Sequence, residues 1–557
     1  MRRTCVVGMA CCATLAAGAA AQETTRASVD SAGVEGDAAS GITGAALSAD
    51  GNVVGFESTA DNLVAGDTNG TWDIFVHDRT SGATELVSVD STGLQGDAPS
   101  FAVSLSQDGQ LVAFTSVADN LVPGDKNSVG DVFVRDRATG VTERVSVDSA
   151  GAEAKGWSGD LGMAITPDGQ FVVFDSSAKN LVAAGTHVVD IFVHDRSTDA
   201  TELVSVDSSG IEANGDCSWP AISADGSIVA FLSAADNLVT GDTNGIVDLF
   251  VHNRTTGLTE RVNVDSAGTE ANDAANSPSL SADGRTVAFD SATDNLVAGD
   301  VNKSGDVFVH DCATGTTELV SVDSGGVQGD LPSQFALLSA DGTSVAFHSA
   351  ADNLVAGDSN GKVDVFVHHR ATGSTVRASV RTNGNQRNGD SFLWNTSADG
   401  TVVAFTSSAN HLVTGDNNGV SDVFVHELCS TAASWANYGA GFPGTNGVPA
   451  FTAQQNPAFG ATIDLDLANS SGVPTVGLLF VGFQRTSVHS GWGGDLLVVP
   501  ALVVPISFSY GGDTFSGGIP NDWSLCGVTV DLQAIEGDAG AAKGVAFTAG
   551  LELVLGE

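Results

Sequence analysis

The chain has 557 residues, of which 22 are basic and 67 are acidic, so its formal net charge at pH 7 is −45. Nucleic-acid binding needs lysine and arginine to displace counterions from phosphates, so this charge argues against a nucleic-acid partner. It also argues against binding to anionic lipid surfaces. It favours cations, cationic partners or a salty medium, and the alternative is that the charge serves only the solubility of a secreted protein.

Residues 1–21 have the pattern of a secretory signal peptide. Arg2 and Arg3 precede an apolar run from Val6 to Ala17, and small residues at 19–21 supply a cleavage pattern. The run is too short to span a bilayer, and no later segment is predicted to be transmembrane. The most apolar later stretch, 496–506, contains two prolines and is interpreted as buried strands. The sequence therefore predicts an exported protein, in the periplasm, on the cell surface or outside the cell.

Residues 22–429 contain seven copies of one unit. The phenylalanine of the phrase V-A-F-x-S recurs every 57 to 60 residues, at Phe56, Phe114, Phe174, Phe231, Phe289, Phe347 and Phe405. A fixed period of this kind is typical of a stacked or closed repeat architecture.

The fifth copy shows the strands that each repeat is expected to form. A short strand from Ser279 runs into an Asp-Gly turn, and further strands follow at 286–291, 306–310 and 317–322. Both faces of the third strand are apolar, so neighbouring sheets must cover each other, as in a β-propeller. The loop after strand two and the loop after strand four are long and are expected at the same end of the sheet, which makes that end the default binding face.

The seventh copy ends after its third strand, at Cys429. The segment Thr24–Ser31, directly after the signal peptide, matches the fourth strand of other copies, such as Thr84–Ser91. We therefore expect an all-β fold, a seven-bladed β-propeller closed by the N-terminal strand, which leaves no open sheet edge.

The phrase S-A-D-G-x-x-V-A-F-x-S, as in Ser223–Ser233, resembles the repeat of TolB-like propellers, which are tryptophan–aspartate-like repeats of secreted bacterial proteins. The continuation over Ala60–Arg79 is similar to an extracellular variant of that repeat. The resemblance covers residues 22–429 and implies the fold. Propellers of this kind serve as protein-docking, ligand-binding and enzyme-associated domains, so it does not select one activity.

Residues 430–557 break the repeat. Alternating runs such as 463–467, 528–532 and 551–555, separated by glycine- and proline-rich turns, predict a β-sandwich module. This region resembles C-terminal modules of secreted bacterial proteins. Cys429 and Cys526 bracket it and are candidates for a disulfide in an oxidising compartment.

The loop between strands two and three carries the pattern D-x-N-G-x-x-D. It resembles the latter part of a calcium-binding loop, in which carboxylate and amide oxygens bind the ion. The alternative is a structural turn, because Asn-Gly is a turn dipeptide and Asp bonds to nearby backbone amides. The candidate calcium ligands are Asp67, Asn69, Asp73, Asp242, Asn244, Asp248, Asp358, Asn360, Asp364, Asp416, Asn418 and Asp422.

Two further residue types recur in the repeats. Six histidines end the third strands and are expected to bond within their own sheets: His77, His194, His252, His310, His368 and His426. Four tryptophans, Trp72, Trp157, Trp219 and Trp394, are expected in the long loops, where they either anchor the loop or bind a sugar ring or a partner side chain.

No nucleophile elbow, zinc-protease, phosphate-loop or dinucleotide motif occurs, so no catalytic residue is assigned. The leading hypothesis is a secreted, non-catalytic binding or scaffold protein whose loop-rich face takes a protein or glycan ligand. The alternative is a carbohydrate-active propeller hydrolase or lyase that uses loop carboxylates.

Overall fold

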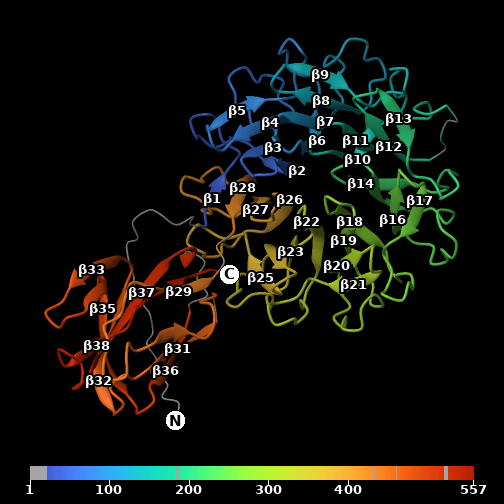
Figure 1. Cartoon of the computed structure of the whole chain (residues 1–557). Coiled ribbons are helices and arrows are strands. Elements are labelled where there is room, and N and C mark those ends of the chain that lie inside the picture. The colour runs from blue at the N-terminus through green and yellow to red at the C-terminus, as the bar shows by residue number, and fades with distance from the viewer. Residues whose placement is uncertain are drawn as a thin grey trace. The chain divides into compact units, whose positions relative to one another are not determined.

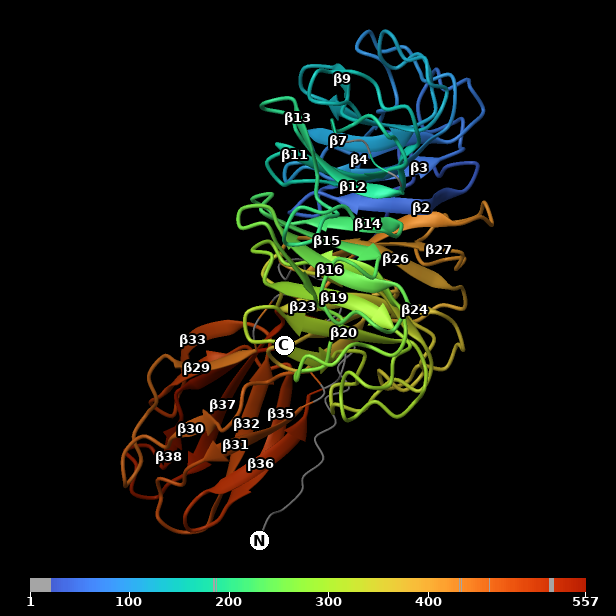
Figure 2. The same cartoon turned by 90° about the vertical axis from the view of Figure 1, so that its right-hand side faces the viewer.

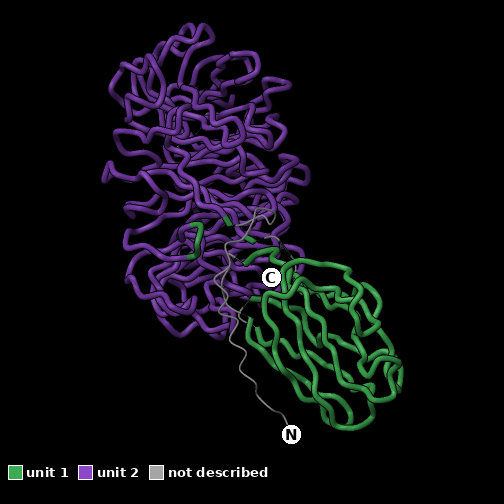
Figure 3. Tube along the Cα trace, turned by 90° about the vertical axis from the view of Figure 1, so that its left-hand side faces the viewer, with its two compact units in different colours: residues 1–22, 382–384, 429–557 green, residues 23–381, 385–428 purple. Residues whose placement is uncertain are grey.

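The computed structural model describes residues 22–183, 186, 188–429, 431, 433–459, 461–519 and 525–556. The predicted signal peptide lies outside these residues. The chain divides into two compact units, shown in Figure 3. We call residues 23–381 and 385–428 the repeat unit; the other comprises residues 1–22, 382–384 and 429–557, and we call it the C-terminal unit.

The described part of the repeat unit forms seven four-stranded antiparallel sheets. Sheet 1 contains β2 (Ser40–Leu47), β3 (Val53–Ser58), β4 (Asp73–Asp78) and β5 (Ala83–Leu86), and sheet 2 contains β6 (Ser100–Leu105), β7 (Leu111–Ser116), β8 (Asp131–Asp136) and β9 (Val141–Arg144). Sheet 3 contains β10 (Ser158–Ile165), β11 (Phe171–Ser176), β12 (Asp190–Asp195) and β13 (Ala200–Leu203), and sheet 4 contains β14 (Cys217–Ile222), β15 (Ile228–Ser233), β16 (Asp248–Asn253) and β17 (Leu258–Arg261). Sheet 5 contains β18 (Ala275–Leu280), β19 (Thr286–Ser291), β20 (Asp306–Asp311) and β21 (Thr316–Leu319), and sheet 6 contains β22 (Ser333–Leu338), β23 (Ser344–Ser349), β24 (Asp364–His369) and β25 (Ser374–Arg377). Sheet 7 contains β26 (Ser391–Thr396), β27 (Val402–Ser407), β28 (Asp422–Glu427) and β1 (Thr24–Arg26).

The sheets follow one another in cyclic order. The first strand of each sheet contacts the first strand of the next, and β2 contacts β26, so these seven strands surround the axis. We call them the inner strands. Figure 1 shows them around the centre of the repeat unit with the fourth strands outside, and Figure 2 shows the sheets from the side. This arrangement is a β-propeller.

Alternation along each strand fills the space between sheets. Phenylalanines of strands two and three pair across the ladder, as Phe56 does with Phe75, while valines point to the other face. The seven phenylalanine pairs are stacked with ring centroids 5.7 to 6.1 Å apart, and every ring is fully buried. The repeated phenylalanine is therefore the core of each sheet-to-sheet contact.

The N-terminal strand completes sheet 7. Thr24, Thr25 and Arg26 of β1 pair with His426, Val425 and Phe424 of β28. A second closure runs through the turns between strands one and two. Backbone amides bond from turn to turn around the axis, from Ala49 to Gln107, Gln107 to Pro167, Ala224 to Ala282, Ala282 to Ala340, Ala340 to Ala398 and Ala398 to Ala49. The link from residue 167 to residue 224 is missing because proline has no N–H to donate.

The recurrent histidines join adjacent sheets. His77 Nδ1 lies 2.8 Å from Thr84 Oγ1, and this hydroxyl donates to the carbonyl of Val29 in sheet 7 at 2.5 Å. Since the threonine has one proton, the ring nitrogen is the donor, and burial lowers the pKa of His77. Each histidine bonds to the fourth strand of its own sheet, as the sequence predicted, and the threonine extends the bond to the preceding sheet. In sheet 2 Arg135 takes the histidine's place and donates to Thr142 and to the carbonyl of Asp90.

The C-terminal unit contains a six-stranded, a three-stranded and a two-stranded sheet. The first is formed by β29 (Ser434–Tyr438), β39 (Gly550–Val554), β37 (Thr529–Gly537), β32 (Thr475–Gly482), β35 (Leu502–Phe508) and β38 (Val545–Phe547), and the second by β30 (Phe451–Ala453), β31 (Thr462–Leu467) and β36 (Asp513–Gly518). The third is formed by β33 (Arg485–His489) and β34 (Asp495–Val498). One hydrophobic core joins the two larger sheets, with Ile463 and Phe451 from one and Leu532 and Leu551 from the other.

A disulfide joins Cys429 and Cys526, whose Cα atoms are 5.7 Å apart. The interpretation of residues 496–506 as buried strands is wrong in part. Strand β35 lies at the edge of its sheet, and Leu502 and Val503, which point to opposite faces, are both exposed. Within the described residues no helix is long and apolar enough to cross a membrane.

Candidate functional site

The acidic loops lie at one end of the sheets, where the long loops meet. The second aspartate of each D-x-N-G-x-x-D pattern is the first residue of strand three and is buried: Asp73, Asp248, Asp364 and Asp422. The first aspartates, Asp67, Asp242, Asp358 and Asp416, lie in the preceding loop. The asparagine side chains cross to the loop after strand four, where Asn69, Asn244, Asn360 and Asn418 donate to the carbonyls of Gly96, Ala271, Arg387 and Gly36.

The amide oxygens of these asparagines are turned inward to their own turn. Asn69 Oδ1 accepts from the N–H of Thr71, and Asn418 Oδ1 accepts from the N–H of Val420. The Nδ2 group of Asn418 donates to Asp422 at 3.1 Å. The asparagines therefore present nitrogen, not oxygen, to the neighbouring carboxylate.

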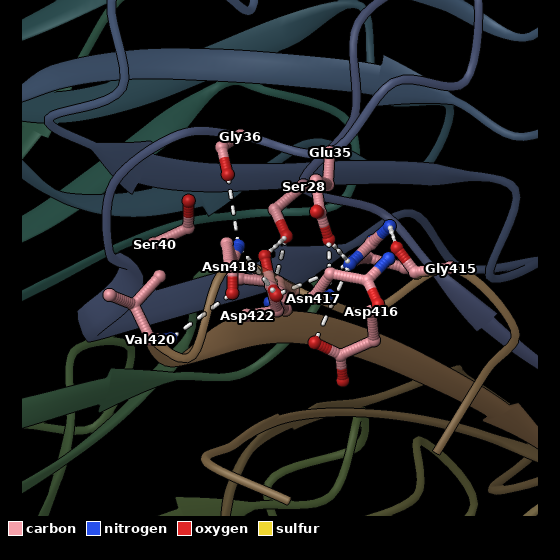
Figure 4. Close-up of polar contacts among 12 residues, drawn as sticks. Ser28, Glu35, Gly36, Ser40, Gly415, Asp416, Asn417, Asn418, Val420 and Asp422 are labelled. Atoms are coloured by element: carbon pink, nitrogen blue, oxygen red, sulfur yellow. Dashed lines mark hydrogen bonds and ion pairs between the residues drawn. The ribbon is translucent and has the colours of Figure 1, made fainter. Parts of the chain in front are cut away.

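Acidic side chains gather in sheet 7, where Figure 4 shows Glu35, Asp416 and Asp422 near one another. Arg26 Nη1 is 2.6 Å from Glu35, 3.4 Å from Asp422 and 3.9 Å from Asp416, and the arginine side chain is almost fully buried. Ser28 donates a further hydrogen bond to Asp422 at 2.6 Å. The guanidinium supplies the positive charge that these buried carboxylates require.

The same cluster recurs in other sheets, with two main compositions. Sheets 2 and 4 use an arginine with a glutamate, Arg144 with Glu153 and Arg261 with Glu270, each beside two aspartates. Sheets 1 and 5 have leucine in place of arginine and glutamine in place of glutamate. In sheet 1 the Gln95 amide donates to Asp67 at 2.7 Å and to Asp73 at 2.8 Å, and Gln328 does the same for Asp300 and Asp306 in sheet 5.

Both compositions give the same formal charge. Two aspartates with a glutamate and an arginine carry −2, and two aspartates with a neutral glutamine also carry −2. In sheet 6 Arg377 stands beside Asp358, Asp364 and Gln386. Burial raises the pKa of Asp73 to about 6, even though Ser88 donates to it. Protein donors thus contact carboxylates in each of these clusters, and calcium binding stays a prediction.

The inner strands carry a second set of recurring features. Each has an irregularity in its register with strand two. At this bulge the backbone of Ala102, Trp219, Ser277 and Phe335 has positive φ, between 46° and 60°. Left-handed backbone at a bulky residue is strained and is concentrated at functional sites in proteins.

Buried polar side chains hold the bulges. They occupy the variable position of V-A-F-x-S, next to the end of strand two. Glu57 accepts from the amides of Thr43 and Gly44, Asp175 accepts from Leu161 at 2.9 Å, and Asp290 accepts from Phe335 of the next sheet at 3.1 Å. These amides are left unpaired by the bulged ladder, so the carboxylates have a structural role.

Aromatic rings gather at the same level of the inner strands. The Phe335 ring lies 6.2 Å from Trp219 and 5.4 Å from Trp394, both edge-on. His348 stacks on Phe335 at 5.9 Å and meets Phe392 at 5.4 Å. Trp219 belongs to sheet 4 and Phe335 to sheet 6, so this contact passes over the small side chain of sheet 5 at that level.

The structure unites two of the four predicted tryptophans. Trp219 and Trp394 belong to inner strands, not to the loops as predicted, because those strands begin several residues earlier than the sequence pattern indicated. Trp72 and Trp157 lie just before β4 and β10 and are not part of this cluster. Phe335 and Phe392 were not predicted; Phe335 shares the repeat position of Trp219, seven residues before the glycine of the following Asp-Gly turn, whereas Phe392 does not.

The buried carboxyl of Glu57 predicts a pH effect. Burial raises its pKa from 4.5 to about 7, so the fold opposes ionisation that the unfolded chain undergoes at lower pH. The unfavourable contribution of ionised Glu57 to the free energy of unfolding is fully present above pH 7 and disappears below about pH 4.5. Relative to the wild type, we expect Glu57→Gln to gain about 3 kcal/mol in free energy of unfolding between pH 4.5 and pH 8.

Urea denaturation at both pH values measures this gain. Glu23→Gln, which changes an exposed carboxylate of the same unit, is the control and should leave the pH dependence unchanged. An equal pH dependence in Glu57→Gln and the wild type would contradict the assignment of this carboxyl.

Among the comparisons with known proteins, only the comparison with solved structures found matches. No protein-family model matches the chain, and no curated protein matches it. A protein assigned to TolB from Agrobacterium tumefaciens is 14% identical, with 62% of this chain and 94% of that chain covered and a TM-score of 0.35. The periplasmic gluconolactonase PpgL of Pseudomonas aeruginosa is 19% identical over 59% of this chain and 82% of its own, with a TM-score of 0.30.

The WD40 repeats of RRP9 are 9% identical, with 73% of this chain and 97% of that chain covered and a TM-score of 0.35. At these scores the matches carry no argument about activity, ligand or location. The fold assignment rests on the sheet topology of this chain.

Proposed function

We propose that this protein is an exported, non-catalytic binding scaffold: a seven-bladed propeller closed by β1 and followed by a β-sandwich module. The pairing of β1 with β28 and the amide link from Ala398 to Ala49 support a closed ring. The shared core of the two larger C-terminal sheets supports the sandwich.

The observation that carries the binding role is the exposure of large apolar side chains at the inner-strand bulges. Ile42 is 49% exposed, Leu161 and Phe392 are each 42% exposed, and Trp219 is 44% exposed. Trp219 in addition has left-handed backbone. Exposed apolar side chains that gather on a rigid scaffold are typical of an interaction site. Aromatic rings are also the side chains that contribute most to protein binding hot spots.

The charge of the molecule favours a basic protein segment as the ligand. A net charge of −45 repels acidic glycans and attracts lysine and arginine, and aromatic rings bind these cations through their faces. The alternative is hydrolysis of a carbohydrate by carboxylates near the axis. The use of Glu57, Asp175 and Asp290 as acceptors for bulge amides supports binding over hydrolysis.

A displayed library of random linear peptides tests this function. Peptides selected on the full chain are expected to be rich in arginine, lysine and aromatic residues, and to bind Trp219→Ala and Phe392→Ala at least 10-fold more weakly. Val327→Ala, which changes an exposed apolar residue of a long loop, is the matched control. Binding that is unaffected by both axial variants, or binding to neutral polysaccharides alone, would contradict the proposal.

A further inference from the structure

One arginine recurs at the start of the turn between strands three and four. It donates to a glycine carbonyl of its own sheet and pairs with a glutamate of the preceding sheet. Arg196 shows the arrangement, with its guanidinium 2.5 Å from the Gly169 carbonyl and 2.6 Å from Glu143. The five arginine–glutamate pairs are Arg79–Glu427, Arg137–Glu85, Arg196–Glu143, Arg254–Glu202 and Arg370–Glu318.

Sheet 5 lacks the arginine of this pair, although sheet 4 retains the glutamate, Glu260. Cys312 stands at the arginine position, and a cavity of about 360 Å³ opens beside it. Among the described residues the Glu260 side chain has no hydrogen-bond or ion-pair partner, and the Gly284 carbonyl receives no donor. Both groups line this cavity. The acceptors of a guanidinium are thus retained where the guanidinium itself is missing.

Sheet 7 shows what happens when the whole pair is lost. Leu428 occupies the arginine position, and Val376 of sheet 6 occupies the glutamate position. Both side chains are buried, so an apolar contact replaces the ion pair. The cavity at Glu260 has no such compensation.

The remaining walls also suit a guanidinium. Arg285 is the one cation that lines the cavity, and it lies 3.7 Å from Asp283, which lines the cavity as well. Glu260 therefore leaves the lining with a net negative charge. In sheet 4 the guanidinium of Arg254 lies over the Phe171 ring, 4.6 Å from its centroid. In the cavity Ile228 takes the place of Phe171 and forms an apolar wall beside Gly284.

We infer that the cavity between sheets 4 and 5 is a binding site for a guanidinium group from outside the chain. Glu260 pairs with the charged group, and the Gly284 carbonyl accepts a second hydrogen bond, as in the five filled positions. This site lies at the ends of the sheets opposite to the long loops and is independent of the axial site proposed above.

Alkylation of the Cys312 thiol reports on occupancy, because this thiol lines the cavity whereas Cys217 is fully buried. The rate is measured on the full chain by mass spectrometry of the Cys312 peptide. N-acetyl-arginine amide is expected to slow alkylation several-fold, and the neutral citrulline analogue is expected to have no effect. Protection should be lost in Glu260→Gln and retained in Glu202→Gln, whose glutamate is already paired.

Equal protection by the arginine and citrulline compounds, or protection that persists in Glu260→Gln, would overturn the inference. Cys312→Arg provides a second measurement, because it supplies the missing guanidinium from the chain. This variant should melt at a higher temperature and should give no heat with N-acetyl-arginine amide in calorimetry; unchanged heat would also overturn the inference. Protection by an arginine peptide at lower concentrations than free arginine would identify a protein source, and equal concentrations would identify a small guanidinium compound.

Discussion

Deletion of residues 22–33 is expected to lower the free energy of unfolding of the repeat unit by more than about 5 kcal/mol. The deletion removes β1 and exposes the edge of β28. It also removes Arg26, so Asp416 and Asp422 remain buried without their cation. Thr24, which bonds to His426 and to the Val380 carbonyl, is lost as well.

Urea denaturation followed by tryptophan fluorescence measures this loss. Arg26→Gln separates the contribution of the cation from that of the strand, and should cost less than the deletion. A synthetic peptide of residues 22–33 should restore part of the stability when it is added to the deletion variant. Unchanged denaturation of the deletion variant would refute closure of the propeller by β1.

Arg144→Leu is expected to destabilise the repeat unit by about 3–5 kcal/mol, because it leaves an uncompensated buried charge. The side chains of Asp125 and Asp131 are buried, and that of Glu153 is partly buried. Loss of the arginine changes the formal charge of this cluster from −2 to −3. The double variant Arg144→Leu with Glu153→Gln reproduces the Leu86 and Gln95 arrangement of sheet 1. We therefore expect the second substitution to recover about half or more of the loss.

Chemical denaturation of the wild type, both single variants and the double variant measures this coupling. Additive losses in the double variant would contradict the exchange between the two cluster compositions.

Calcium is titrated in the same series. One oxygen each from Asp125, Asp131 and Glu153 lies within 4.8 Å of the others, so calcium should raise the melting temperature of Arg144→Leu.

In the wild type the guanidinium contacts one oxygen of each of these carboxylates, and we expect millimolar calcium to leave melting unchanged. A calcium-dependent shift in the wild type would instead support the calcium sites predicted from Asp67, Asp242, Asp358, Asp416 and their partners. The titration thus separates a metal-ordered loop from one ordered by arginine or glutamine.

The β-propeller fold was predictable because its signals are local and repeated. Alternating residues mark strands two and three in every copy, and Thr24–Ser31 copies a fourth strand closely enough to predict its partner. The topology confirms the propeller. The inner strands were harder to delimit, since a bulge breaks their alternation and shifts residues such as Trp219 out of phase with the pattern.

The acidic clusters could not be predicted from the loop pattern alone. Arg144 lies nine residues before Glu153 and more than ten after Asp131, so no short motif contains the cluster. A partial signal was present in the repeats, because arginine accompanies glutamate in sheets 2, 4 and 7 and leucine accompanies glutamine in sheets 1 and 5, whereas sheet 6 combines arginine with glutamine and sheet 3 combines leucine with glutamate. That pattern becomes interpretable only when the fold places the two positions side by side.

The chain of turn-to-turn bonds around the axis has one proline in it. Pro167 accepts from Gln107 but donates nothing to Ala224, so within the described residues the turn-to-turn bond between sheets 3 and 4 is the one missing from this network. This boundary is therefore the natural seam of the ring. New chain ends or an inserted domain would disturb the circular network least at that turn, where the network is already interrupted.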